Sequence, residues 1–335
     1  MTTPDQPMLE LRGVSKRFVK SIDTAARIAN VFGAGIKEEI VHAVDDVDLV
    51  IRRGEVVGLV GESGCGKSTL GRMAVGLHSL SSGTRRWKEE DIDALAPAER
   101  RIKQLGIQMI FQDPYASLNP RMRVLDIVGE APVAHKMISG SEQVAYVEGL
   151  LQRVGLDPAV LRRFPHQFSG GQRARVGIAR ALAVRPEFLV CDEAVAALDV
   201  SIQAQVLNLF IRLRDELNLT YLFISHDLGV VRHLSDRVVI MYLGRIVESA
   251  PADAVFDHAN HPYTQALLAS APKLEARKTE FFAVRGEIPS PLNPPGGCHF
   301  HPRCAHAMAR CSVEKPALRE VAPAHFSACH LNDQP

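Results

Sequence analysis

Several features of specialised protein classes are missing from this chain of 335 residues. No apolar run approaches the roughly 18 residues that a membrane-spanning helix needs. The 39 lysines and arginines are matched by 38 aspartates and glutamates, so no basic excess favours nucleic acid. Residues 1–6 lack the basic and apolar regions of a signal peptide. We expect a cytoplasmic protein that binds no nucleic acid and reaches a membrane only through a partner.

The composition that is present is that of an ordinary globular protein. Hydrophobic residues make up 46% of the chain and charged residues 23%, which is enough for a sizeable core. The length allows two domains, or one large domain with an appendage. The six cysteines are unevenly placed, because four of them lie between residues 298 and 329. In a reducing cytoplasm such a cluster indicates a metal rather than disulfides.

The most specific motif occupies residues 61–69 and matches the pattern G-x-x-x-x-G-K-[ST]. An apolar stretch at 56–60 precedes it and a helical pattern at 70–77 follows it, which is the context of a phosphate-binding loop. A glycine-rich turn that binds nothing would not need both flanks. We predict that Lys67 reaches the β- and γ-phosphates of a nucleotide and that the Ser68 hydroxyl ligates Mg²⁺. The candidate nucleotide ligands are Gly61, Glu62, Ser63, Gly64, Cys65, Gly66, Lys67, Ser68 and Thr69.

Strand and helix patterns alternate on both sides of this loop, which predicts an α/β fold with a largely parallel sheet covered by helices. We expect a nucleotide-binding domain at 1–250 with a helical insertion at about 113–166. A proline-rich linker then leads into a cysteine-rich extension within 251–335. The expected strands lie at 8–18, 41–50, 56–60, 107–112, 187–193, 220–226, 237–242 and 245–248. The expected helices lie at 70–77, 99–105, 142–154, 172–183, 200–217 and 228–235.

An acidic pair, Asp192 and Glu193, ends one of the predicted buried strands. Phosphoryl transfer to water needs a group that holds the metal ion and a base that orients the water. Asp192 would hold Mg²⁺ through its waters, and Glu193 would polarise the attacking water. An acidic pair after a strand is usually just a solvated strand end. The phosphate loop earlier in the chain makes the catalytic interpretation the stronger one.

The order of these motifs resembles that of the ATP-binding subunits of ABC transporters, over nearly the whole chain. The resemblance implies a P-loop NTPase (RecA-like) core with an N-terminal antiparallel β subdomain and an inserted α-helical subdomain. Gln112, in Ile-Phe-Gln-Asp-Pro, is similar to the family's Q-loop glutamine. That residue would touch Mg²⁺ and report the nucleotide state to the helical insertion and to a permease.

Residues 168–172, Phe-Ser-Gly-Gly-Gln, resemble the family's signature motif, with phenylalanine where leucine is commoner. Ser169 precedes a predicted helix, so its hydroxyl and the following amides would form a second anion site. A simple helix cap is the alternative, but it does not explain two adjacent glycines. The resemblance implies that the signature contacts the γ-phosphate of ATP bound by an opposite subunit, so that ATP closes a dimer. The signature's candidate ligands are Ser169, Gly170, Gly171 and Gln172.

Three further residues resemble functional positions of the family. Asp199 matches the D-loop aspartate, and His226 matches the switch histidine that contacts the γ-phosphate. Phe18 is the candidate aromatic side chain for stacking on adenine, although it could equally be a core residue. The resemblance thus implies Glu193, His226, Gln112 and Lys67 as the catalytic residues.

Two positions depart from the family pattern Asp-Glu-Pro-x-Ser-x-Leu-Asp. Ala194 and Ala196 stand where proline and serine are usual. Neither position supplies a catalytic group, so we expect the subunit to hydrolyse ATP. The changes loosen the turn after Glu193 and remove one possible hydrogen bond across a dimer.

The end of the chain is similar to the C-terminal extension of dipeptide and oligopeptide importers, through residues 261–268, 286–291 and 297–298. Residues 112–121 are also typical of that group. The segments before Val41 and at 290–295 look most like the F-type member of a two-ATPase pair, which favours a heterodimer over a homodimer. The implied partners are a second ATPase subunit, two permease subunits and an extracytoplasmic solute-binding protein. The implied location is peripheral, on the cytoplasmic face of the inner membrane.

The four tail cysteines, Cys298, Cys304, Cys311 and Cys329, follow the spacing C-x5-C-x6-C-x17-C. Four thiolates suit tetrahedral zinc or a [4Fe–4S] cluster. The short C-x2–4-C knuckles that zinc sites favour are absent. The resemblance to peptide importers implies a [4Fe–4S] cluster, with zinc or no metal as the alternatives. A structural or regulatory role is the expectation, because the cysteines lie far in sequence from the ATP motifs.

Two other functional classes are open to a chain with this loop. A soluble ABC protein acting on ribosomes or DNA would carry two ATPase modules or long heptad helices, whereas this chain has one module and no basic face. A kinase or GTPase would lack the signature at 168–172 and the order Gln112, Ser169, Asp192, His226. The importer ATPase is therefore the leading prediction. The sequence does not identify the transported solute.

Overall fold

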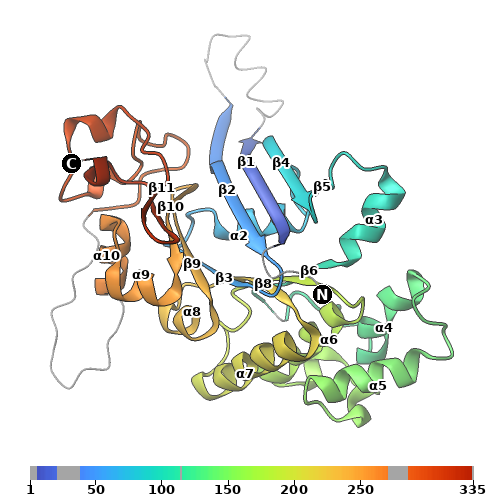
Figure 1. The fold of residues 1–335 in the computed structure, drawn as a ribbon. Helices are drawn as coiled ribbons and strands as arrows, with labels where there is room; N and C mark the ends of the chain where they lie inside the picture. The colour runs from blue at the N-terminus through green and yellow to red at the C-terminus, as the bar shows by residue number, and fades with distance from the viewer. Residues whose placement is uncertain (1–5, 21–37, 114, 271–285, 334–335) are drawn as a thin grey trace, which may run out of the picture.

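The computed structural model describes residues 6–20, 38–113, 115–270 and 286–333, and these form two sheets with helices around them (Figure 1). The smaller sheet is antiparallel and has the strand order β2-β1-β4-β5. Alternating apolar side chains bury its inner face, as the predicted strand at 8–18 requires. Its strands are β1 (Pro7–Lys20), β2 (Glu39–Arg52), β4 (Ser82–Trp87) and β5 (Glu90–Asp91).

Five parallel strands in the order β9-β3-β8-β7-β6 make the centre of the larger sheet. Every residue of β3, β7 and β8 is buried, as expected for short apolar strands covered on both faces. The strands are β3 (Val56–Val60), β6 (Ile107–Ile110), β7 (Phe188–Asp192), β8 (Thr220–Ile224) and β9 (Arg237–Tyr242).

Helices cover this parallel sheet, and a helical subdomain packs beside it. The subdomain's apolar side chains form one cluster with α6 and α7, which ties the insertion to the core (Figure 1). The helices up to residue 234 are α2 (Lys67–Ala74), α3 (Pro97–Leu105), α4 (Val124–Ala134), α5 (Gln143–Arg153), η1 (Pro158–Arg162), η2 (Pro165–Gln167), α6 (Gly170–Leu182), α7 (Val200–Leu217) and α8 (Leu228–Leu234). Within the described ranges no helix is both long and apolar enough to cross a membrane.

The C-terminal extension continues the larger sheet. Strand β12 (His325–Ser327) pairs antiparallel with β10 (Arg245–Pro251), and β11 (Arg319–Ala322) pairs with β12. The carboxylate of Glu248 in β10 is fully buried and accepts hydrogen bonds from the N–H groups of Asn260 and His261. His325 Nε2 lies 2.6 Å from the same carboxylate. The remaining elements are α9 (Ala252–His258), α10 (Pro262–Ser270), η3 (His301–Arg303), η4 (Ala309–Ser312) and η5 (His330–Asp333).

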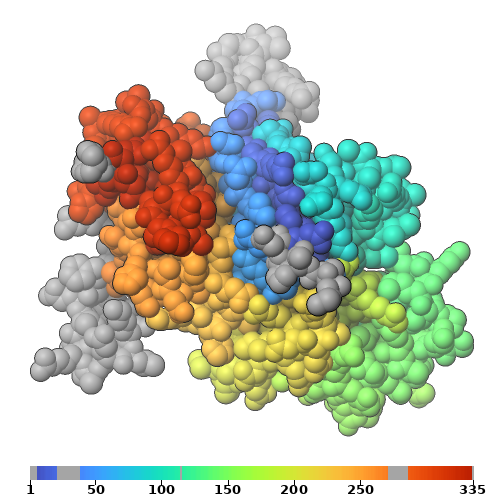
Figure 2. Space-filling model, in the orientation of Figure 1, coloured from blue at the N-terminus to red at the C-terminus, as the bar shows by residue number. Residues whose placement is uncertain are grey.

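The extension also lies against the smaller sheet. Figure 2 shows the C-terminal residues packed beside the strands near the N-terminus. The N–H of His42 in β2 donates to the carbonyl of Pro291 over 2.9 Å, and Lys315 Nζ lies 2.5 Å from the Asp46 carboxylate. The extension thus contacts both the edge of the larger sheet and strand β2.

The predicted fold class is confirmed, including the antiparallel subdomain and the helical insertion. Helix α7 and strands β3 and β9 have the predicted bounds. Helix α6 begins two residues earlier than predicted, at Gly170. Strands β4, β5, β11 and β12 were not predicted. Much of the irregular segment predicted before residue 41 lies outside the described residues, and the domain boundary at 250 stays a prediction.

Candidate functional site

The predicted phosphate loop joins β3 to α2, and two of its glycines have no room for a side chain. A Cβ atom on Gly61 would lie 2.1 Å from the carbonyl oxygen of Met241. One on Gly66 would lie 2.2 Å from the carbonyl oxygen of Ala43, and the φ angle of Gly66 is +107°. Glycine is therefore required at both ends of the loop, where β2 and β9 press against it.

Lys67 begins α2 and is folded back over the loop. Its Nζ donates hydrogen bonds to the carbonyl oxygens of Gly61, at 2.8 Å, and Glu62, at 2.9 Å. Only 5% of the residue is exposed. The ammonium group is thus held beside the backbone amides that would surround phosphate oxygens.

Ser68 and Asp192 meet across 124 residues of chain. The Ser68 hydroxyl donates to Asp192 Oδ1 over 2.7 Å. The pKa of Asp192 is raised, because the effect of burial is larger than those of the hydrogen bond from Ser68 and the nearby charge of Arg72, which lower it. A hydroxyl and a carboxylate side by side are the hard oxygen ligands that Mg²⁺ prefers.

Three of the predicted catalytic side chains lie together, and Glu193 is the central one. Gln112 Nε2 donates to Glu193 Oε2 over 2.7 Å, and His226 Nδ1 lies 3.4 Å from Glu193 Oε1. These residues follow the neighbouring parallel strands β6, β7 and β8, whose carboxyl ends share one edge of the sheet. Glu193 has a φ of +47°, a left-handed conformation that is costly for a glutamate. The fold therefore holds its carboxylate between the amide and the imidazole.

The predicted signature caps α6. Gln172 N–H donates to Ser169 Oγ over 3.4 Å, and Ser169 N–H donates to Gln172 Oε1 over 3.1 Å. The two glycines differ in their surroundings: a Cβ on Gly171 would lie 2.4 Å from Ile202 Cγ2, whereas Gly170 is exposed. Gly171 thus has a packing role between α6 and α7. No hydrogen bond joins 169–172 to the phosphate loop among the residues described.

Two further predicted site residues, Asp199 and Phe18, make no side-chain hydrogen bond to Glu193 among the residues described. Asp199 is the exposed N-cap residue of α7 and makes no side-chain capping bond. Phe18 lies near the end of β1, with 37% of its surface exposed, and its ring meets the edge of His78 at 5.4 Å between centroids. Its β2 partner, Val41, lies two residues from Ala43, whose carbonyl faces the loop. An exposed ring near the loop is compatible with stacking on a base, and the core alternative does not fit its exposure.

All four tail cysteines line one small cavity, together with His301, His306 and His330. Burial raises the pKa of Cys298 to about 11, and it also raises the pKa values of Cys304 and Cys329. Among the residues described, no three His, Cys, Asp or Glu side chains are placed to hold a metal ion. The four cysteines thus lie around one cavity, whereas the metal itself stays a prediction.

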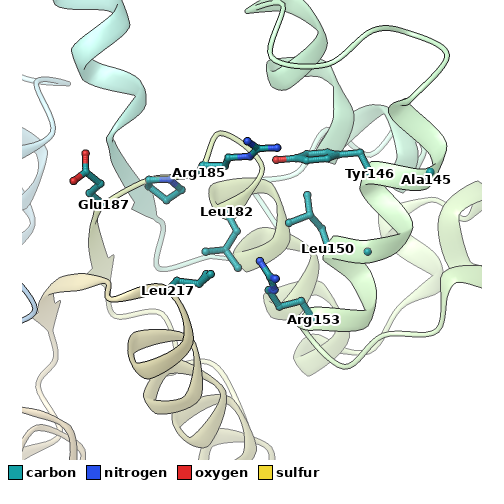
Figure 3. Close-up of a pocket in the computed structure, with 10 residues that line it drawn as sticks. Ala145, Tyr146, Leu150, Arg153, Leu182, Arg185, Glu187 and Leu217 are labelled. Carbon is teal, nitrogen blue, oxygen red and sulfur yellow. The ribbon is translucent and has the colours of Figure 1, made fainter.

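A separate hollow of about 650 Å³ lies between α5 and the start of β7 (Figure 3). Tyr146, Leu150, Arg153, Arg185 and Glu187 are among the side chains that border it. None of the predicted site residues lines it. It opens near the amino ends of the parallel strands, whereas Glu193 lies at their carboxyl ends.

Sequence reasoning missed two residues that contact the phosphate loop from the extension. Tyr263 Oη accepts a hydrogen bond from the N–H of Glu62, and Arg303 forms an ion pair with its carboxylate. Both lie more than 200 residues from the loop. No spacing rule joins such distant positions, although Tyr263 falls in the stretch that indicated the importer-type extension.

Two family models match the chain. Residues 44–196 match the model described as ABC transporter, and residues 247–311 match the model described as the oligopeptide/dipeptide transporter C-terminal region. The first match contains the phosphate loop, Gln112, the signature and Glu193. The second contains Tyr263 and three of the four tail cysteines.

Curated relatives and solved structures agree with these matches. The chain is 49% identical to the oligopeptide transport ATP-binding protein AppF of Bacillus subtilis, over 99% of both chains. It is 44% identical to a putative peptide import ATP-binding protein of Brucella ovis, covering 97% of this chain and 98% of the relative. The ATP-binding cassette MJ0796, in a dimeric post-hydrolysis state with ADP and phosphate, superposes with a TM-score of 0.62. It is 27% identical and covers 73% of this chain and 99% of that one. The chain belongs to the ATP-binding subunits of the ABC transporter family.

Proposed function

We propose that this subunit hydrolyses ATP to power the import of oligopeptides or related solutes through a membrane permease. The observation that carries the proposal is the convergence of Gln112 and His226 on Glu193, beside the Ser68–Asp192 pair. The relatives at 44–49% identity support peptide import rather than a ribosome- or DNA-associated role.

The site residues divide the chemistry between them. Lys67 and the loop amides would bind the β- and γ-phosphates, while Ser68, Gln112 and Asp192 would hold Mg²⁺, whose charge would screen the phosphates. Glu193 orients and polarises the attacking water, and His226 contacts the γ-phosphate. Gln112 is hydrogen-bonded to Glu193 in this structure, and its amide oxygen would be a further ligand for the metal ion. Phe18 stacks on the adenine base.

The site is completed by a second ATPase subunit. Ser169, Gly170 and Gln172 are exposed and stand apart from this chain's own loop. The exposed N-terminus of a helix attracts an anion. We infer that these residues bind the γ-phosphate of ATP on the partner subunit, with Asp199 at the same interface. The partner is a homologous subunit in a heterodimer or a second copy in a homodimer.

A groove of about 490 Å³ on this subunit is suited to a permease segment. Leu77, Met109, Phe111, Ala131 and Val184 are among the side chains that line it. Phe111 is next to Gln112, so the groove adjoins the residue that senses the nucleotide. The groove would receive an apolar cytoplasmic segment of the permease, and the subunit would then lie peripherally on the cytoplasmic face of the membrane. A solute-binding protein outside the membrane would deliver the solute.

Replacing Leu77 with glutamate is expected to weaken association with the permease by about tenfold or more. Leu77 is 56% exposed in the groove, and the new carboxylate would lose its water when an apolar segment docks. Co-purification of the subunit with its co-expressed permease measures the loss.

The matched control is Val144→Glu, because Val144 is an exposed apolar residue of α5 outside the groove. ATP binding by the isolated Leu77→Glu subunit should be unchanged. Normal association of Leu77→Glu with the permease would exclude the groove as its docking site.

We further propose that Cys298, Cys304, Cys311 and Cys329 hold a [4Fe–4S] cluster. What supports it is their position around one cavity. A cluster accepts thiolates that stand further apart than those around one zinc ion, because each thiolate binds a different iron. When bound, the cluster would link the segment around η3, which carries Cys298 and Cys304, to η4 with Cys311 and to Cys329 after β12. Such a link is a structural or regulatory role.

Anaerobic purification should therefore give a coloured protein with about four iron atoms and four acid-labile sulfides per chain. Cys304→Ser should lose the iron, whereas Cys191→Ala, at a buried cysteine in β7, should keep it. Elemental analysis and visible absorption measure both. A colourless protein without iron would contradict the proposal, and one zinc ion per chain would favour the zinc alternative.

A further inference from the structure

An ion pair links the C-terminal extension to the phosphate loop. Arg303 Nη1 lies 2.7 Å from Glu62 Oε2, and Nη2 lies 3.0 Å from Oε1, so the guanidinium binds the carboxylate with both arms. The side chain of Arg303 is 5% exposed and that of Glu62 is 22% exposed. Two-armed pairs away from solvent are the strong class of charge-assisted hydrogen bonds.

The backbone of Glu62 is held as well. Its N–H donates to Tyr263 Oη over 2.9 Å, and Tyr263 is fully buried. The rings of Tyr242, Tyr263 and Phe300 pack together with centroids 4.7–5.4 Å apart. Arg303 Nη1 also donates to Tyr242 Oη over 3.4 Å. This aromatic group fixes both Arg303 and Tyr263, so the second residue of the loop is anchored at its side chain and its amide.

The same residue touches the group that binds phosphate. Lys67 Nζ donates to the carbonyl oxygen of Glu62 over 2.9 Å. The position of Glu62 thus helps to set where the lysine rests before nucleotide arrives. A displacement of this residue would move the carbonyl and the ammonium group together.

The negative charge of Glu62 is neutralised by Arg303. A carboxylate in a loop that binds the negatively charged phosphates of ATP would repel them. A partly buried carboxylate without a partner is also costly in itself. The guanidinium cancels the charge of Glu62 and supplies donors to both of its oxygens.

We propose that Arg303 is a positioning residue of the nucleotide site, which neutralises Glu62 and keeps the phosphate loop in its ATP-binding geometry. Arg303 does not touch the reacting atoms. It acts through Glu62, and its effect falls on nucleotide affinity rather than on the chemical step. The C-terminal extension is then a part of the ATP site, held behind the loop.

Arg303→Ala is expected to raise the Kd for a non-hydrolysable ATP analogue, and the KM for ATP, about tenfold. The kcat of the subunit, assayed with its partner ATPase, should stay within about threefold, because no catalytic group has moved. Arg303→Lys keeps the charge but loses the two-armed geometry, so its Kd should be intermediate.

A double-mutant cycle distinguishes charge neutralisation from general damage to the extension. In the Glu62→Gln background, Arg303→Ala should change the Kd by less than about threefold, because no carboxylate remains to be neutralised. The matched control is Arg319→Ala, which removes a more exposed ion pair with Asp333 in the same extension. It should leave the Kd unchanged.

Two results would overturn the proposal. One is an unchanged Kd for Arg303→Ala or, if that variant does not fold, for Arg303→Lys. The other is an equal loss of affinity from Arg303→Ala in the wild-type and Glu62→Gln backgrounds, which would mean that Arg303 acts independently of the carboxylate. Both readouts use nucleotide binding by the subunit itself, so they do not depend on peptide transport or on a metal in the extension.

Discussion

Steady-state ATP hydrolysis should fall by about 10²- to 10⁴-fold when Glu193 is replaced by glutamine, which is the range for loss of a general base. The amide keeps the size of the side chain and can still bond to Gln112, so the site should remain assembled. Nucleotide binding should persist. The variant would therefore accumulate as an ATP-bound closed dimer with its partner subunit, measured by phosphate release and by size-exclusion chromatography with ATP.

The matched control for this loss is Glu216→Gln, a more exposed glutamate near the end of α7, whose hydrolysis rate should match that of the wild type. Hydrolysis by Glu193→Gln at the wild-type rate would remove Glu193 from the role of base. Loss of ATP binding in the same variant would indicate instead that the carboxylate holds the site together.

Replacing Lys67 with alanine should weaken ATP binding by about 10- to 100-fold, the loss expected for a charged hydrogen-bond donor at phosphate. The ammonium group already lies within the loop, bonded to the carbonyls of Gly61 and Glu62. Removing it leaves the two carbonyls without this donor and the phosphates without their nearest cation. Titration with a fluorescent ATP analogue measures the change.

Lys67→Arg tests whether position matters in addition to charge, because a guanidinium does not fit the space of a compact ammonium group. It should bind ATP less well than the wild type. Lys103→Ala is the control, since that lysine lies on α3 and forms ion pairs with exposed glutamates. ATP affinity in Lys67→Ala equal to that of the wild type would contradict the assigned role.

Local signals in the sequence predicted most of the core. The apolar run at 56–60 and the glycine pattern after it are short-range features, and their structure is settled within a few residues. The long amphipathic stretch of α7 was predicted to the residue. The carboxyl ends of neighbouring parallel strands share one edge of the sheet, which is why Gln112, Glu193 and His226 lie together in the structure. The roles of Gln112 and His226 were predicted from the family resemblance.

Features that depend on long-range contacts were not accessible in the same way. Strand β4 reads Ser-Gly-Thr-Arg-Arg-Trp, whose polar residues give no buried-strand pattern, and it forms by pairing with β1. Strand β12 has only three residues, too few for a sequence pattern, and it is a strand because it pairs with β10. Gly171 was interpreted with the signature alone, because its close approach to Ile202 depends on how two helices pack. The pair of Glu62 and Arg303 depends on tertiary structure in the same way.

The pairing of β10 with β12 constrains how such a chain changes during evolution. Strand β10 presents its outer backbone groups to β12, and the buried Glu248 in β10 faces His325. A chain that ended before β12 would leave the edge of β10 unpaired, and an unpaired edge can pair with strands of other molecules. The buried carboxylate of Glu248 would also lose the imidazole of His325. Loss of the extension would thus require compensating changes in the ATPase core. The two parts are expected to be inherited as one piece rather than exchanged between transporters.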